Sequence, residues 1–178
     1  MVDPSGLSES AIVVLVPEAE PVVGRWREEL DSSAAIGVPA HVTLLYPFAA
    51  PIDITEDLIA KVAGTVSAFG GFDYQLEEVR WFDDTVVWLA PVPVGPFIAL
   101  TTLLLGAFPH FPRYGGAFGD DVVPHVTIGD RGPFARLQEA ARDVASSLPI
   151  SAQARDVALL CGGASVGSWH VIRTMPLE

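Results

Sequence analysis

The order of the predicted elements along the chain indicates an α+β fold built from two related halves. Short β-rich runs alternate with helical stretches, and the order strand–helix–strand–helix–strand–strand occurs twice. The tripeptide His-Val-Thr stands on the second strand of both copies. We therefore expect one bilobal domain over residues 1–178 with pseudo-twofold symmetry, in which two mainly antiparallel sheets flank a central cleft with helices outside. The approximate repeats are 11–84 and 85–178.

Each element of the first half has a local signal. The apolar first run stops at Pro17, which predicts a buried strand. Pro21 begins the first helix, whose charges we place on one face. Thr55 is the expected N-cap of the second helix, with acidic residues in its first turn. The predicted strands are 11–16, 41–45 and 72–80, and the predicted helices are 21–30 and 55–69.

The second half begins after a hairpin turn at Asp83 and Asp84 and repeats the pattern. Its first strand again stops at a proline, Pro91. A loop rich in proline, glycine and aromatic residues, 108–121, comes before the second motif. A loop of this length is often a lid or a substrate clamp, and an ordinary surface loop is the equal alternative. The predicted strands are 85–90, 125–128, 152–160 and 169–175, and the predicted helices are 95–107 and 134–148.

Composition excludes several classes of protein. Half of the 178 residues are apolar and 18% are charged, which excludes global disorder. Ten basic and 22 acidic side chains give a net charge of −12, which disfavours a long nucleic-acid groove but is compatible with a short nucleotide held by a few arginines. No apolar run approaches the ~20 residues of a membrane span. We expect a cytoplasmic protein without membrane contact, and its oligomeric state stays open.

The two His-Val-Thr segments carry the predicted chemistry. Residues i and i+2 of a strand share a face, so His41 lies beside Thr43 and His125 beside Thr127. Two imidazoles across a cleft suit in-line displacement at phosphorus, because one ring takes a proton while the other delivers one. The hydroxyls can donate to the non-bridging phosphate oxygens. We expect no metal ion or cofactor, since no carboxylate cluster has the spacing of a metal site.

These segments, Pro39–Phe48 and Pro124–Asp130, resemble the motifs of the 2H phosphoesterases, also called the 2′-5′ RNA ligase-like superfamily. The element order over nearly the whole chain and the closing segment Trp169–Leu177 support the resemblance. It implies a bilobal fold whose members hydrolyse or form cyclic or 2′,5′-linked phosphodiesters without metal. Carried over by motif position, it implies that His41 and His125 are the acid–base pair and that Thr43 and Thr127 bind phosphate.

Four further residues are candidates for contacts to a small nucleotide or an RNA terminus. Tyr46 follows the first motif and is a candidate for the cleft. Arg113 and Tyr114 lie in the loop before the second motif, where arginine can contact phosphate and tyrosine can stack on a base. Arg131 follows Asp130, one place later than the arginine of some family members.

Other residues and functions were weighed. His110 and His170 lack a following x-Thr, so we expect structural or solvent-facing roles. Cys161 sits in a turn-like stretch beside two glycines and has no base partner in the sequence, and Trp169 is expected in the core. The alternative function is a binding module that holds a nucleotide or RNA end without turnover. A metal site built from the histidines is weaker, because two ligands are too few.

Overall fold

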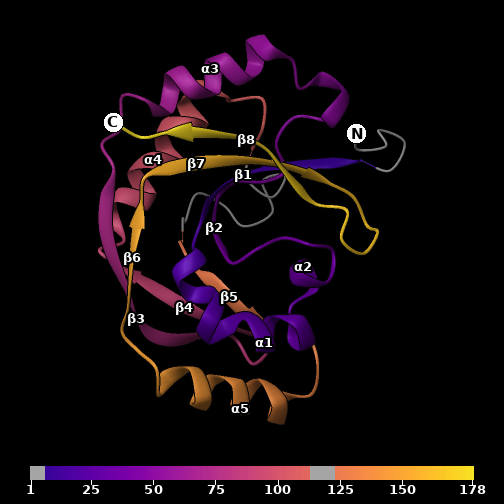
Figure 1. Ribbon diagram of the computed structural model, residues 1–178, viewed down its shortest axis with the longest axis vertical. Coiled ribbons are helices and arrows are strands. Elements are labelled where there is room, and N and C mark those ends of the chain that lie inside the picture. The colour runs from indigo at the N-terminus through magenta and orange to yellow at the C-terminus, as the bar shows by residue number, and fades with distance from the viewer. Residues whose placement is uncertain (1–6, 113–122) are drawn as a thin grey trace.

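Eight strands form two antiparallel four-stranded sheets in the computed structural model, which describes residues 7–112 and 123–178 (Figure 1). The first sheet has the order β2 (His41–Leu45), β1 (Glu9–Leu15), β7 (Asp156–Gly162), β8 (His170–Pro176). The second sheet has the order β5 (Val126–Gly129), β4 (Val86–Val92), β3 (Phe72–Phe82), β6 (Ile150–Ala154). This architecture confirms the predicted α+β class.

Helices cover the outer faces of both sheets. They are α1 (Glu20–Leu30), α2 (Ser32–Ala35), α3 (Glu56–Val66), α4 (Gly95–Ala107) and α5 (Phe134–Ala145). In Figure 1, α3 lies over the first sheet, while α1 and α5 lie against the second. The predicted cap is confirmed, since the Thr55 hydroxyl accepts a hydrogen bond from the amide of Leu58 at 3.2 Å.

The chain crosses between the sheets in a symmetric way. Each His-Val-Thr strand is an edge strand beside the first strand of its own half, and the next neighbour comes from the other half. Helix α1 follows β1 of the first sheet but packs on β5, whereas α4 follows β4 of the second sheet and packs on β2. The strand orders of the two sheets correspond to each other, as a duplication would predict. The repeat boundaries 11–84 and 85–178 stay a prediction.

One large apolar core joins the two sheets. It contains residues from the inner strands of both, such as Val14 and Leu159 in the first sheet and Leu76 and Leu89 in the second. Burial of such side chains contributes roughly 25 cal/mol per Å² of apolar surface. The fixed core holds both motif strands from behind.

Two predicted elements are wrong in detail. The strand expected at 152–160 is two strands, β6 and β7, which belong to different sheets and are separated at Arg155. The Arg155 guanidinium is bonded to the Asp73 carboxylate at 2.7 Å, on the neighbouring strand β3. Cys161 lies within β7 and is buried, not in a turn.

The charges of α1 are not all on one solvated face. Arg27 is 2% exposed, although Arg25 and Glu28 on the same helix are exposed. Its guanidinium is held in a buried ion pair, so the prediction of a single charged face is wrong at this position.

Candidate active site

Strand β2 presents His41 and Thr43 on one face. Both side chains are half-buried, whereas Val42 and Leu44 between and beyond them are fully buried. The pairing with β1 places Leu15 opposite His41 and Val13 opposite Thr43. The period of two is the reason for this division, since successive side chains of a strand point to opposite faces. The imidazole and hydroxyl therefore share an accessible face, as predicted from the sequence.

The second motif has the same division. His125 directly precedes β5, and His125 and Thr127 are half-buried, whereas Val126 and Ile128 are fully buried. Trp88 of β4 lies opposite Thr127 in the pairing and so shares its face. Each half of the chain thus supplies one imidazole and one hydroxyl on one face of a strand. The opposite face of that strand is packed into the core.

Both histidine rings are held by the same kind of hydrogen bond. The Nδ1 atom of His41 is 2.7 Å from the carbonyl oxygen of Pro39, and the Nδ1 atom of His125 is 2.7 Å from that of Val123. A carbonyl oxygen can only accept, so Nδ1 carries the proton in each case. In the neutral ring the lone pair is then on Nε2, the nitrogen that can take up a proton.

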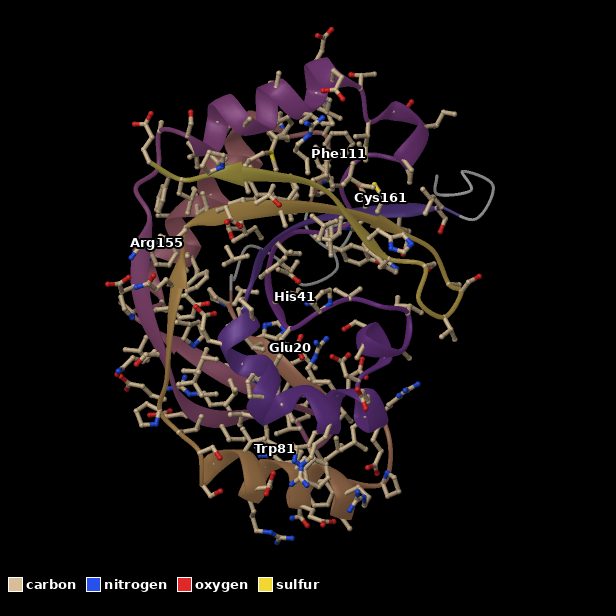
Figure 2. All side chains as sticks on the ribbon, in the orientation of Figure 1. Glu20, His41, Trp81, Phe111, Arg155 and Cys161 are labelled. Atoms are coloured by element: carbon tan, nitrogen blue, oxygen red, sulfur yellow. The ribbon has the colours of Figure 1, made fainter. Side chains whose placement is uncertain are left out.

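The structure brings the two motif strands together. Strands β2 and β5 are in contact although they belong to different sheets. The charge of His125 is close enough to contribute to lowering the pKa of His41. Figure 2 shows His41 toward the middle of the molecule, near Glu20 of α1. Neither ring is sealed in the core, since both are half-buried.

The environment of His41 favours the neutral ring. Desolvation is the largest cause and lowers its pKa to about 4, against an ordinary value of 6.5. The bond to the Pro39 carbonyl and the charge of Asp31 act in the opposite direction, while Arg27 and His125 lower the pKa further. Near neutral pH, His41 is therefore a neutral imidazole whose Nε2 can accept a proton.

Aromatic rings surround His125. The Phe82 ring lies edge-on to the imidazole with centroids 5.1 Å apart, and the Trp88 ring lies 5.7 Å away. Phe82 and Trp88 stack on each other at 4.7 Å. The contacts with these two rings limit how far the imidazole of His125 can move. The sequence prediction did not include them, and the only available signal was their place at the predicted hairpin.

A small apolar cluster, separate from the main core, lies on the motif face of the first sheet. Its buried members are Ala11, Val13, Val38, Ala158, Leu160 and Trp169. Tyr46 packs against it, with its ring 6.3 Å from that of Trp169, and its hydroxyl donates to the Glu9 carboxylate at 2.9 Å. Trp169 is 6% exposed, which confirms the prediction of a packed position. Tyr46 is half-buried and borders the face that carries Thr43.

The remaining sequence candidates are placed as follows. Arg131 is exposed in the turn after β5, and its backbone amide donates to the carbonyl of Leu30 at 3.0 Å. Arg113 and Tyr114 lie outside the described residues, as does most of the predicted loop 108–121. His110 and His170 are exposed, in agreement with the prediction of a solvent-facing place.

Cys161 and the residue types that ligate metals are arranged as follows. Burial raises the pKa of the Cys161 thiol to about 11, so that the thiol stays protonated near neutral pH. Within residues 7–112 and 123–178, no three His, Cys, Asp or Glu side chains are grouped as metal ligands would be. In the same residues, no helix has the length and apolar character to cross a membrane.

Comparison with known proteins connects this geometry to a family. A sequence profile described as the 2′-5′ RNA ligase superfamily matches residues 15–163. Escherichia coli LigT in complex with NADP+ is 18% identical, with a TM-score of 0.61 over 97% of this chain and 99% of LigT. LigT complexed with 3′-AMP gives 16% identity and a TM-score of 0.61, again over 97% and 99% of the two chains.

A Thermus thermophilus protein is also similar in structure. It is 18% identical, with a TM-score of 0.65, over 95% of this chain and 97% of that protein. No curated protein sequence shows a significant match. The structural likeness supports the fold, and the profile match covers both His-Val-Thr strands. The chain accordingly belongs to the 2′-5′ RNA ligase superfamily of 2H phosphoesterases.

Proposed function

We propose that this member of the superfamily is a metal-independent phosphodiesterase that hydrolyses, or reversibly forms, a cyclic or 2′,5′-linked nucleotide phosphodiester. The single observation that carries the proposal is the matched pair of hydrogen bonds from Nδ1 of His41 and His125 to backbone carbonyls. Two rings held in the same tautomer, each with Nε2 as the reactive nitrogen, suit a proton relay across one phosphate. Membership of a phosphoesterase superfamily supports the reaction class.

In the hydrolytic direction, His41 acts as the general base. Its low pKa keeps it neutral at pH 7, so Nε2 takes a proton from water as the water oxygen bonds to phosphorus. The bond from phosphorus to the leaving ribose oxygen breaks, and that oxygen takes a proton from Nε2 of protonated His125. The two rings exchange protonation states in the step, and exchange with solvent restores them.

The hydroxyls of Thr43 and Thr127 donate to the non-bridging phosphate oxygens in this proposal. Both stand two residues after a histidine on a half-buried face, a place from which they can reach the same phosphate. Negative charge on these oxygens is stabilised by hydrogen-bond donors that are already in position. Tyr46, Arg113, Tyr114 and Arg131 are the proposed substrate contacts.

A small nucleotide or an RNA terminus is the proposed substrate. LigT has been crystallised with 3′-AMP, ATP and NADP+, all of which contain an adenosine nucleotide. The net charge of −12 also favours a short ligand, since extended nucleic-acid binding depends on many Lys and Arg contacts. The half-buried ring of Tyr46, which packs on the small apolar cluster, offers a surface for a base or ribose.

The experiment that tests this function separates turnover from binding. Purified protein is incubated in EDTA with 2′,3′-cyclic AMP and with a 2′,5′-linked diadenosine, and the products are resolved by chromatography. We expect conversion of at least one of them to a monophosphate product. Binding without conversion would favour the alternative of a nucleotide-binding module. Activity that is lost in EDTA and restored by a divalent ion would overturn the metal-independent mechanism.

A further inference from the structure

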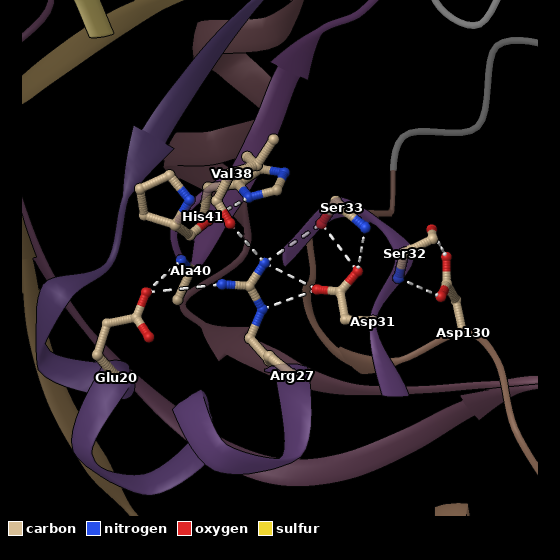
Figure 3. A network of polar contacts seen from close by, with 10 residues as sticks. Glu20, Arg27, Asp31, Ser32, Ser33, Val38, Ala40, His41 and Asp130 are labelled. Carbon is tan, nitrogen blue, oxygen red and sulfur yellow. Dashed lines mark hydrogen bonds and ion pairs between the residues drawn. The ribbon is translucent and has the colours of Figure 1, made fainter. Parts of the chain in front are cut away.

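The corner that follows α1, residues 30–33, touches the supports of both histidine strands. It lies where α1 of the first half packs on β5 of the second sheet. Figure 3 shows two sets of polar contacts leaving this corner, one toward the segment before His41 and one toward Asp130. We refer to these four residues as the corner.

On the side of His41, the corner is joined to a buried ion pair. Arg27 and Asp31 are 2% and 1% exposed, and Nε and Nη2 of Arg27 each lie 2.8 Å from Oδ2 of Asp31. Nη2 of Arg27 also donates to the carbonyl of Val38 at 3.0 Å. The Glu20 carboxylate accepts a bond from the amide of Ala40 at 2.6 Å.

These contacts bracket Pro39, the residue whose carbonyl fixes the ring of His41. The carbonyl before Pro39 and the amide after it are both held by charged side chains. A shift of Arg27 would therefore move the acceptor of the imidazole proton. Hydrogen bonds to charged groups are shorter and roughly twice as strong as those between neutral groups.

On the side of His125, the corner is bonded to the end of β5. The carbonyl of Leu30 accepts from the amides of Asp130 and Arg131, at 2.8 and 3.0 Å. The Asp130 carboxylate in turn accepts from the amide of Ser32 at 2.8 Å and from its hydroxyl. Gly129 permits this approach, because a Cβ there would lie 2.8 Å from Cβ of Leu30.

We propose that Arg27, Asp31 and Asp130 are positioning residues. Through the corner, they fix the position of each histidine strand relative to the other. The inference rests on the proposed function, since it assigns these residues a role in a two-histidine reaction. Asp31 is linked through Arg27 to the segment before β2, and Leu30 and Ser32 are bonded to the end of β5. A displacement of one strand would therefore move the other. A misplacement of about 1 Å in a catalytic site can lower the rate by 10²-fold.

The first test compares two carboxylates, one bonded to the corner and one bonded to α1 itself. Asp130→Ala removes the bonds to Ser32 that hold the end of β5. Asp143→Ala is the matched control, because Asp143 of α5 accepts bonds from Arg25 and Trp26, and within the described residues it makes no hydrogen bond or ion pair with β2 or β5. We expect Asp130→Ala to lower kcat on a converted substrate about 10- to 100-fold with KM changed less than about 3-fold. The control should keep its kcat within about 3-fold.

The second test reads the His41 ring without a substrate. In the double variant Arg27→Met/Asp31→Asn no fully buried charge is left unpaired, because Glu20, the other ion-pair partner of Arg27, is partly exposed to water, so the fold should persist. Histidine 15N chemical shifts distinguish the Nδ1–H from the Nε2–H tautomer. We expect a single Nδ1–H form of His41 in the wild type and in Asp143→Ala, and a mixture of tautomers in the double variant.

The inference is overturned if Asp130→Ala has wild-type kcat, or if the double variant keeps the single tautomer of His41. It is also overturned if Asp143→Ala lowers kcat as much as Asp130→Ala. The loss of any contact between α1 and its neighbours would then lower kcat, and the corner would have no special role. Failure of the proposed function is a different result: wild-type protein would convert no phosphodiester, while the tautomer measurement could still be made. If the double variant does not fold, Arg27→Lys supplies the same readout with the charge retained.

Discussion

His41 and His125, 84 positions apart in sequence, make the same hydrogen bond: Nδ1 of each lies 2.7 Å from the carbonyl oxygen of the residue two places earlier. One bond is to Pro39 before β2 and the other to Val123 before β5. The two rings therefore have the same protonated nitrogen although they belong to different sheets.

The threonine hydroxyls should contribute to turnover and not to folding. Thr43→Val and Thr127→Val keep the shape of the side chain and remove its donor, so we expect each to lower kcat/KM by about 10- to 100-fold. Thr102→Val is the matched control, because the Thr102 hydroxyl donates to the carbonyl of Ile98 within α4 and belongs to neither motif. Steady-state kinetics on a converted substrate checks the prediction. If both motif variants kept the wild-type kcat/KM, the threonine hydroxyls would not be ligands of the phosphate.

Protonation of His41 should destabilise the folded protein. Its pKa is about 4 when folded and about 6.5 when unfolded, so the unfolded chain binds more protons between these values. The stability is fully present above pH 6.5 and is lost as the pH falls toward 4. For a half-buried ring we expect a loss of about 1–2 kcal/mol from this group.

Urea unfolding at pH 7 and pH 4.5, with wild type and His41→Gln side by side, isolates this contribution. The carboxylates titrate in both proteins, so only the difference between the two pH dependences reports on His41. We expect the wild type to lose more unfolding free energy than the variant. Equal losses would show that the imidazole is not desolvated as described.

Much of this site could be predicted from the sequence, because the motif strands obey a simple period. The alternation of half-buried and buried side chains at 41–44 and 125–128 follows directly from strand geometry. The buried Arg27–Asp31 pair could not be predicted in this way. A charged pair at i,i+4 is typical of an exposed helix face, and only the packing of 38–40 over it causes its burial.

The division of 150–162 into two strands shows a second limit. The residues 150–154 alternate between buried and exposed, whereas nearly all of 156–162 are buried. This change of pattern reflects the passage from the edge of the second sheet to the interior of the first. The burial pattern does not show that the two parts belong to different sheets. The sequence therefore predicts one continuous strand across Arg155, where the structure has a break.

The buried ion pair should respond differently to single and double substitution. Arg27→Met leaves the Asp31 carboxylate buried without its cation, which we expect to cost about 3–5 kcal/mol of unfolding free energy. Arg27→Met/Asp31→Asn removes both charges and keeps an acceptor for the Ser33 amide, so it should cost less than the single variant. Denaturant unfolding of both proteins checks the order. A double variant as unstable as the single one would contradict it.

Gly129 and Gly64 should respond with opposite sign to the same substitution. A Cβ at Gly129 would lie 2.8 Å from Leu30 and Leu137, whereas nothing lies within 4 Å of one at Gly64 in α3. We expect Gly129→Ala to cost about 1–3 kcal/mol through overpacking. Gly64→Ala should stabilise by about 0.5–1 kcal/mol, because alanine is the better helix former. Thermal unfolding of the two variants measures both, and a neutral Gly129→Ala would mean that the corner is not closely packed on β5.

The most direct test of the account is the turnover of a cyclic or 2′,5′-linked phosphodiester by His41→Ala, His125→Ala and the double variant, with exposed His110→Ala as control. If the two imidazoles share one proton relay, each single variant lowers kcat by about 10²- to 10⁴-fold in EDTA. The double variant is then little worse than either single one, and the control is unchanged. Retention of more than about a tenth of wild-type kcat by either folded single variant would contradict catalysis by this pair.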